Sequence, residues 1–225
     1  MDYRTTLPQI PKWLEDHIYE IIKKSDDSQI RYEDEFQDRM EEEAANWIGR
    51  GDKELEAISE IAKLDYNEDD TLGLHFSNPK AYETYNTTLA KFDFIPVDDI
   101  VNQWVKENIQ PLIKESVVGV NLQVMHHGSI ITPHVDELRH QALNYQFETG
   151  GDNVTTSYYE VLPEYQHLKA YPRTLIPYER LKKIAETIIP VRTWVCLNVM
   201  STIHSVDGMD ATKRRIALSV SVINE

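Results

Sequence analysis

Cysteine is nearly absent from this sequence of 225 residues, and so is any long apolar segment. The single cysteine, Cys196, cannot form a disulfide within the chain, and it lies in an apolar run that predicts a buried and unreactive thiol. The first residues lack the apolar core of a signal peptide, and no stretch approaches the length of a membrane span. We therefore expect a cytoplasmic protein that is not embedded in a membrane.

Basic residues are also scarce. The chain has 23 Lys and Arg residues against 38 Asp and Glu residues, which gives a formal net charge of −15. A surface of this charge repels phosphate backbones, and the sequence contains no local basic patch, so a nucleic-acid partner is not expected. Cationic small molecules or basic proteins are easier partners. The length suits one domain, or one domain with a helical extension.

Residues 1–116 carry apolar side chains at helical spacing and are predicted to form a helical region that packs on the rest of the chain. Helices are expected over residues 10–24, 36–48, 55–62 and 98–109, the last with Asp98 or Asp99 as its N-cap. The acidic run at residues 26–43 is interpreted as a solvated helix face rather than a docking surface. Residues 65–96 are expected to form loops with short strands.

Beyond residue 117 the apolar pattern alternates with a period of two, which predicts strands. They are expected over residues 117–125, 142–147, 155–161, 191–200 and 215–222. A turn at residues 126–129 would join the first strand to residues 130–134 as a hairpin. Residues 162–190, with four prolines and a helical pattern in Leu181, Ile184, Ala185 and Ile188, are interpreted as an insertion or lid. These features predict an α+β protein in which residues 117–225 form a double-layered β core, with the helical region in the same structural domain.

Two short stretches within the predicted core carry candidate metal ligands. His134 and Asp136 are two residues apart on an extended segment, so their side chains project to the same side and can converge on one ion. His204 follows a predicted strand, in a region of turn character, and is the natural third ligand. Two imidazoles and one carboxylate are the ligand set of many non-haem Fe(II) sites. The alternative is a chance His-x-Asp pairing with a surface histidine at position 204.

Other histidines are less suited to this role. His126 and His127 are adjacent, so on a strand they point to opposite sides and cannot easily bind one metal. We interpret them as surface residues or as residues that support the ligands. Tyr158, Tyr159 and Trp194 could line a substrate pocket, although strand aromatics are more often part of a core.

Arg215 begins a cleanly alternating strand. One face of that strand carries Arg215, Ala217, Ser219 and Ser221, small and polar enough to line a site, whereas the other face is apolar and can pack on the N-terminal helices. Arg214 falls on the second face at the strand edge, where we expect it to be solvated. A planar guanidinium holds a carboxylate through two parallel charge-assisted bonds. The alternative for Arg215 is a structural salt bridge.

The order His134-x-Asp136, a distant His204, and Arg215 at the head of a strand resembles the Fe(II)/2-oxoglutarate-dependent oxygenases. The prolyl and aspartyl/asparaginyl hydroxylase branches look closest, because Gly128 precedes His134 by six residues and His204-Ser205-Val206 leads into Arg-Ile-Ala-Leu-Ser. The resemblance covers roughly residues 118–225. It implies a double-stranded β-helix, or jelly-roll, core on which the N-terminal helices pack.

The resemblance also implies a site and a reaction. His134, Asp136 and His204 would hold Fe(II), and Arg215 would hold the distal carboxylate of 2-oxoglutarate. Dioxygen would be consumed to hydroxylate a C–H bond of a small molecule or protein side chain, with release of succinate and carbon dioxide. Asp136 as a ligand argues for hydroxylation over halogenation.

The sequence departs from the family at one position. Some members have a serine two residues after the arginine, and here that residue is Ala217. A helper hydroxyl for the cosubstrate must then come from elsewhere, with Ser219, Tyr145 and Ser157 as candidates. Two other functions stay open: a cupin-like metal hydrolase or isomerase that does not use 2-oxoglutarate, and a non-catalytic binding scaffold. No motif identifies the substrate.

Overall fold

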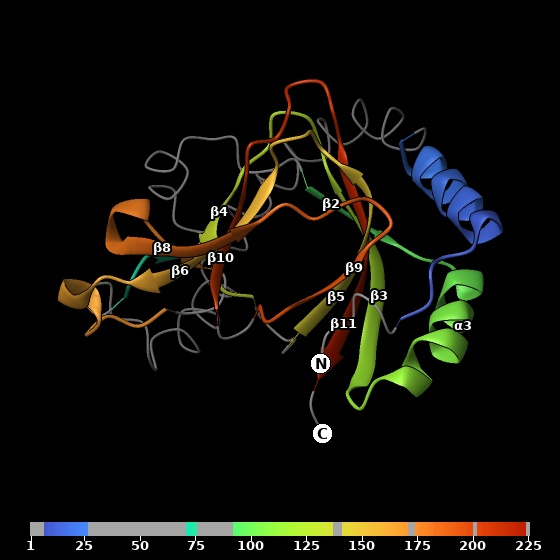
Figure 1. The fold of residues 1–225 in the computed structure, drawn as a ribbon, viewed down its shortest axis with the longest axis horizontal. Coiled ribbons are helices and arrows are strands. Elements are labelled where there is room, and N and C mark those ends of the chain that lie inside the picture. The colour runs from blue at the N-terminus through green and yellow to red at the C-terminus, as the bar shows by residue number, and fades with distance from the viewer. Residues whose placement is uncertain are drawn as a thin grey trace, which may run out of the picture.

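The computed structural model of the chain describes residues 7–26, 71–75, 92–136, 141–170, 174–199 and 202–223. Within these residues antiparallel sheets dominate and helices are few, as expected for an α+β protein (Figure 1). The helices predicted over residues 36–48 and 55–62 lie outside the described part of the chain. Among the described helices, none has the length and apolar character needed to cross a membrane.

The larger sheet has five strands in the order β2-β3-β11-β5-β9. Its strands are β2 (Phe92–Pro96), β3 (Ser116–Met125), β5 (Gln141–Thr149), β9 (Trp194–Leu197) and β11 (Arg215–Ile223). All neighbouring strands are antiparallel. Strand β2 comes from the region predicted to be helical and with loops, and it adds an edge strand next to β3.

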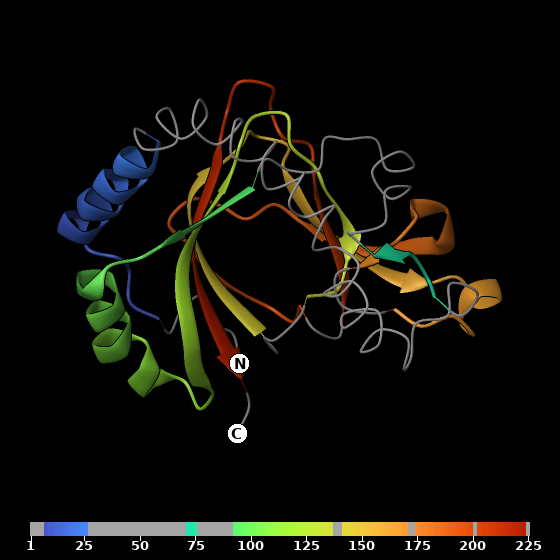
Figure 2. The ribbon, with the colours of Figure 1, turned by 180° about the vertical axis from the view of Figure 1, so that it is seen from behind.

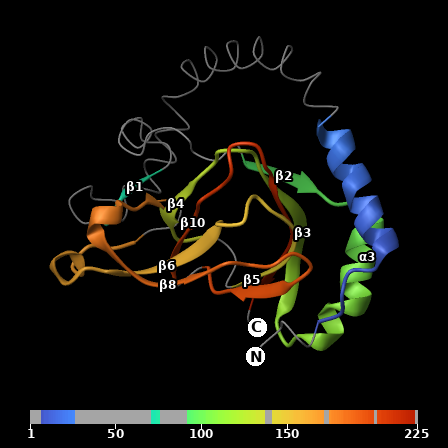
Figure 3. The same cartoon turned by 45° about the horizontal axis from the view of Figure 1, so that its top comes forward.

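The smaller sheet has four strands in the order β4-β10-β6-β8. They are β4 (Ile131–His134), β6 (Thr155–Val161), β8 (Leu181–Thr187) and β10 (Ile203–Asp207). A further two-stranded pair, β1 (Leu74–His75) with β7 (Thr174–Leu175), lies beside β4 (Figure 3). The described connections contain three short 3-10 helices: η2 (Gln110–Leu112), η3 (Pro163–Tyr165) and η4 (Tyr178–Arg180).

The predicted hairpin between residues 117–125 and 130–134 is wrong. Strand β3 is paired on both sides, with β2 and β11, so it has no free edge for β4. The turn instead carries the chain across to the smaller sheet, with Gly128 in the left-handed region at φ 68° and its N–H donating to the Asp210 carbonyl at 3.1 Å. The first predicted metal ligands therefore lie on the smaller sheet.

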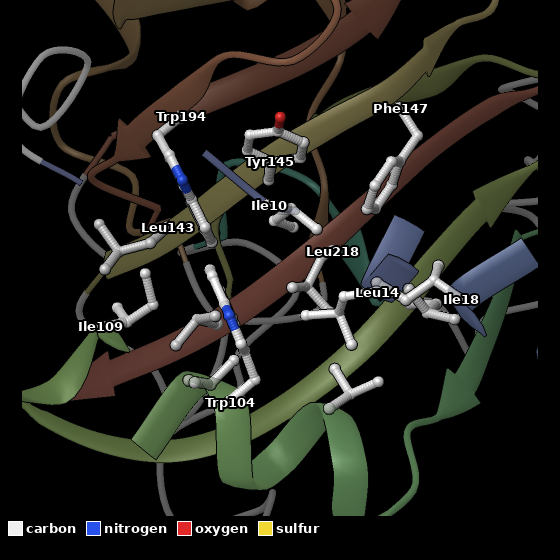
Figure 4. Packing of buried hydrophobic residues seen from close by; sticks show 14 of the residues in the cluster. Ile10, Leu14, Ile18, Trp104, Ile109, Leu143, Tyr145, Phe147, Trp194 and Leu218 are labelled. Atoms are coloured by element: carbon white, nitrogen blue, oxygen red, sulfur yellow. The ribbon is translucent and has the colours of Figure 1, made fainter. Parts of the chain in front are cut away.

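Two helices cover the outer face of the larger sheet (Figures 1 and 2). The first spans residues 12–26 and the second is α3 (Asp99–Asn108), whose predicted N-cap Asp98 accepts from the Val101 N–H at 3.2 Å. Both predicted helices are confirmed. Their buried residues join the apolar face of β11 in one cluster that includes Leu14, Ile18, Val101, Trp104, Ile216, Leu218 and Val220 (Figure 4). Full burial of each such side chain contributes about 1.5–3 kcal/mol, so this layer is the main hydrophobic core.

The segment predicted as a helical insertion forms part of the smaller sheet. Residues 181–187 are strand β8, which pairs with β6 along its whole length. Leu181 is buried at its start, but Ile184 and Ala185 are exposed, so the apolar residues at helical spacing do not mark a buried helix face. Extended backbone instead satisfies the hydrogen-bonding groups along the edge of β6. Lys182, Lys183 and Glu186 are exposed on this edge strand, a composition that discourages further strand pairing.

Candidate metal centre

The three predicted ligands meet on the inner face of the smaller sheet. Strands β4 and β10 are adjacent and antiparallel, and His134 is directly opposite His204 in their register. The two imidazole centroids are 4.4 Å apart. Asp136 follows the end of β4, where its backbone N–H donates to the Val199 carbonyl at 2.9 Å. The prediction that these residues converge is confirmed, although His204 lies within strand β10 and not in a turn.

The ligand atoms are close enough to share one ion. Asp136 Oδ1 lies 3.1 Å from His134 Nε2 and 3.9 Å from His204 Nε2, and one potential ligand atom from each residue lies within 4.8 Å of the others. All three side chains are largely buried, with 14%, 13% and 8% exposure for His134, Asp136 and His204. Burial from water strengthens the interaction between these groups and a cation.

Both imidazoles are oriented by the same local hydrogen bond. His134 Nδ1 lies 2.8 Å from the Thr132 carbonyl, and His204 Nδ1 lies 3.0 Å from the Thr202 carbonyl. A carbonyl oxygen can only accept, so each Nδ1 carries the proton and donates it. In the neutral imidazoles each Nε2 then presents a lone pair toward Asp136, an arrangement of acceptors that a metal cation satisfies. Metal-binding histidines are commonly held by hydrogen bonds of this kind.

Arg215 lies at one end of the space between the two sheets. It is the first residue of β11 and its side chain crosses to the smaller sheet, where it donates to Thr156 Oγ1 on β6 at 3.3 Å. Apolar residues of both sheets and of the adjoining connections close this end: Met125, Val154, Val206, Ile131 and Met209 form one cluster. The guanidinium is buried, and the loss of hydration lowers the pKa of Arg215 to about 10.

No carboxylate pairs with Arg215 in the part of the chain that the structure describes. The alternative of a structural salt bridge therefore finds no partner among these residues. A buried cation without a counter-ion is costly and favours the binding of an anion. The chemistry of the guanidinium suits a planar carboxylate in particular.

Arg215 and the metal ligands face the same interior. Thr156 pairs with Val206 and Tyr158 pairs with His204, so these four residues share the inner face of the smaller sheet. Thr156, the contact of Arg215, is two residues along β6 from the position opposite His204, or about 7 Å at the usual rise of a strand. An elongated ligand could therefore contact the guanidinium at one end and the triad at the other.

The three candidate helper hydroxyls are not brought to Arg215. Tyr145 faces the opposite side of the larger sheet, where its ring packs on Trp194 and its hydroxyl donates to Gln9 Oε1 at 2.8 Å (Figure 4). Its proposed cofactor role is therefore wrong. Ser219 shares the face of Arg215 but is four residues away, about 13 Å along the strand. Ser157 follows Thr156 on β6 and so points to the outer face.

Thr156 is the hydroxyl that sequence reasoning missed. It lies next to the candidate Ser157, and the alternation of β6 places one of the two on the inner face. The sequence pattern did not show whether Thr156 or Ser157 faces inward, because the register of β6 with β10 decides this.

Glycine is required where the chain turns behind Arg215. Gly150 lies in the turn after β5 with φ 80°, a conformation that other residues rarely adopt. A Cβ at this position would overlap the side chain of Met209 and come within 3.1 Å of Arg215 Cβ. The turn can therefore close the apolar end of the interior only with glycine at residue 150.

Several other predicted candidates lie outside the site. His126 pairs with Asp93 at 2.6 Å, and His127 is exposed. Arg214 forms an ion pair with Asp26 at 2.7 Å, at the end of the first helix, and is not simply solvated as expected. Tyr159 and Trp194 belong to buried clusters rather than to the inner face. Cys196 is partly buried, and burial raises the pKa of its thiol to about 11, in agreement with an unreactive cysteine.

Comparisons with known proteins do not add to this description. No model of a protein family matches the chain, and no curated protein matches it in sequence. Its function is therefore inferred from the residues and geometry of the site.

Proposed function

We propose that this chain is an Fe(II)- and 2-oxoglutarate-dependent dioxygenase that hydroxylates a C–H bond of a small molecule or a protein side chain. The observation that carries the proposal is the placement of two unlike features in one interior. A His-Asp-His triad lies on one sheet, and a buried arginine with no carboxylate partner among the described residues enters from the other. A metal alone would explain the first feature, and an anionic cosubstrate would explain the second.

The strand arrangement supports this proposal, and we infer that the two sheets form a double-stranded β-helix. Successive strands from β3 to β6 alternate between the larger and the smaller sheet, and strands β8 to β11 do so again. The resulting orders, β3-β11-β5-β9 and β4-β10-β6-β8, support a jelly roll, in which eight strands fold as two Greek keys. Strand β2 extends the larger sheet by one strand.

The donor set of the triad fits Fe(II). Two neutral imidazoles and one carboxylate, without thiolates, are typical of non-haem iron sites that leave positions for other ligands. In the proposed enzyme His134, Asp136 and His204 hold the metal, and the carbonyls of Thr132 and Thr202 keep both rings oriented. Bound iron and 2-oxoglutarate together would supply the activation of dioxygen, so that one oxygen atom enters the substrate C–H bond and the other enters succinate, with carbon dioxide released.

Arg215 then binds the distal carboxylate of 2-oxoglutarate. Thr156 orients the guanidinium, and the apolar cluster behind it excludes water, which strengthens the charge-assisted bonds. The length of 2-oxoglutarate suits a ligand that reaches from Arg215 to the triad. The negative charge of the chain favours a cationic or basic substrate.

Anaerobic binding of Fe(II) and 2-oxoglutarate to the apoprotein tests the proposal. We expect about one Fe(II) per chain, and a loss of metal affinity of more than about 100-fold in Asp136→Ala and His204→Ala, because second-shell changes alone often cost 10- to 100-fold. His126→Ala, which removes a histidine that pairs with Asp93 outside the triad, is the control and should bind Fe(II) normally.

The two steps of binding distinguish the proposal from its rivals. With iron bound, 2-oxoglutarate should bind to the wild type and much more weakly to Arg215→Met. A triad that binds metal in a protein that does not bind 2-oxoglutarate would instead favour a cupin-like hydrolase or isomerase. Failure to bind a metal would favour a non-catalytic scaffold.

A further inference from the structure

The inner face of the larger sheet carries a row of three polar side chains, two amides and one hydroxyl, across three strands. Asn121 on β3, Ser219 on β11 and Asn144 on β5 are direct partners in the register, and we call these three residues the amide row. Gln146 lies two residues from Asn144 on the same strand and pairs with Ala217. The row is on the face that carries Arg215, because Arg215 and Ser219 share the parity of β11.

Three carbonyl oxygens of these amides have no hydrogen-bond partner among the described residues, although they are buried. They are Oδ1 of Asn121, Oδ1 of Asn144 and Oε1 of Gln146. Asn144 is only 6% exposed and Gln146 only 1%. The orientation of Gln146 is fixed, because its Nε2 donates to the Ile216 carbonyl at 2.9 Å and also to the Glu148 carbonyl. Its oxygen is therefore the end that lacks a partner.

Unsatisfied buried acceptors are costly, and native proteins rarely keep several of them together without a functional reason. The side chains on β11 between the amides are too small to meet them, since Ala217, Ser219 and Ser221 occupy this face of the strand. The three acceptors thus belong to side chains of the inner face, the face that carries Arg215, and a bound molecule with hydrogen-bond donors would satisfy them.

The amide row also lies near the candidate metal centre. Tyr158, which is opposite His204 on the smaller sheet, packs on a cluster that contains Ala142 and Val195 of the larger sheet. Ala142 is two residues from Asn144 on β5, and Val195 pairs with Asn144 directly. The row therefore lies beside the part of the larger sheet on which Tyr158, the residue opposite His204, packs.

We propose that the amide row, with Gln146, is a substrate subsite that accepts hydrogen-bond donors, and that the substrate carries an amine, guanidine or amide N–H near the C–H bond that reacts. The reaction in this statement rests on the proposed dioxygenase function, whereas the binding of donors does not. A hydrocarbon substrate would leave the three acceptors unpaired, and sites built for hydrogen bonds reject such molecules strongly. The row contains no carboxylate, so neutral and cationic donors are both accepted.

Stability of the apoprotein gives a test that needs no ligand. Asn121→Leu, Asn144→Leu and the double variant replace unsatisfied amides with apolar side chains of similar size. If the amides are kept for binding, the double variant should unfold at a higher denaturant concentration than the wild type. An unchanged or lower midpoint would mean that the amides stabilise the fold, and would overturn the proposal.

Ligand binding gives the second test, with L-lysine, L-arginine and L-glutamine as donor probes and hexanoate and heptanoate, which carry no N–H group, as hydrocarbon probes. We expect at least one donor probe to bind the metal-free wild type about tenfold more tightly than the hydrocarbon probes, as the loss of one hydrogen bond predicts. The double variant should lose that preference, whereas Asn102→Leu on the exposed face of α3 should keep it. No donor preference in the wild type, or one that survives in the double variant, would overturn the proposal. Fe(II) binding by the same preparations tests the dioxygenase proposal separately.

Discussion

The same kind of local hydrogen bond orients both histidine ligands. Each imidazole donates Nδ1–H to the carbonyl two residues before it, from Thr132 for His134 and from Thr202 for His204. Because the acceptor is main chain on the same segment, the orientation of the ring depends on the backbone and not on a distant side chain. The triad is therefore set largely by two short stretches and by the pairing of β4 with β10.

Replacement of Arg215 tests whether its charge is kept for a ligand. Burial lowers the pKa of Arg215 to about 10, so the folded protein disfavours the charged form, and this cost is present below that pH and relieved as the pH rises through it. At neutral pH Arg215→Met should therefore stabilise the apoprotein by about 1–3 kcal/mol, as neutralising buried charges often does. Urea unfolding of both apoproteins measures the change.

A second arginine provides the control for this measurement. Arg180 donates to the carbonyls of Thr71 and Leu72, at 3.3 Å and 2.9 Å, so its charge has fixed partners in the fold. Arg180→Met should lose stability. If Arg215→Met is also destabilised, its bond to Thr156 is structural and the guanidinium is not kept for an anion.

At the scale of elements, side-chain hydrogen bonds also hold the outer face of strand β10. Asp207 accepts from Tyr178 Oη at 2.7 Å and from Ser205 Oγ at 2.6 Å, and Tyr159 lies 3.0 Å from Ser205. Burial and the bond to Asp207 raise the pKa of Tyr178, so its phenol stays protonated as a donor. This network fixes the strand that presents His204 to the interior.

Asp98, the N-cap of α3, should make part of the free energy of unfolding depend on pH. Burial acts to raise the pKa of Asp98, but the hydrogen bonds from His17 and from the Val101 N–H outweigh it and lower the pKa. A lowered carboxyl pKa gives stability that is present above the unfolded pKa, about 3.9, and is lost as the pH falls through the folded value. Asp98→Ala should therefore cost about 1 kcal/mol at neutral pH, and the cost should vanish in acid.

Urea unfolding of the wild type and Asp98→Ala between neutral pH and the acid limit of folding measures this dependence. Asp99→Ala is the matched control, because Asp99 is in the first turn of α3 but is not its cap, and its loss should be smaller. A difference between wild type and Asp98→Ala that persists or grows on acidification would contradict the assigned role.

Local pattern predicted most elements, but not how they pair. The alternating residues of β3, β5, β6, β9 and β11 and the capped helix α3 could be read from the sequence because period and capping are local properties. Strand β8 could not, because its apolar residues follow a helical spacing and its extended conformation depends on the edge of β6. The partner of β4 was missed for a related reason, since sheet pairing is decided by residues far apart in the chain.

At the scale of the whole molecule, the helices and the candidate site use opposite faces of the same sheet. The outer face of the larger sheet packs on the helices (Figure 3). Its inner face carries Arg215 and the amide row. The alternation of polar and apolar residues along β11 predicted that its two faces would differ in this way. The contact of Arg215 with Thr156 could not be predicted, because it crosses between two sheets whose relative register is not encoded in either strand alone.

The central claim is that the triad and Arg215 bind one metal and one 2-oxoglutarate together. The most direct measurement is an anaerobic titration of the apoprotein with Fe(II) and then with 2-oxoglutarate, followed by the visible charge-transfer absorption that appears when the keto acid chelates iron. We predict this band in the wild type and a sharp weakening of it in Arg215→Met. Iron binding without the band would contradict the claim, because the metal site would then exist without the cosubstrate.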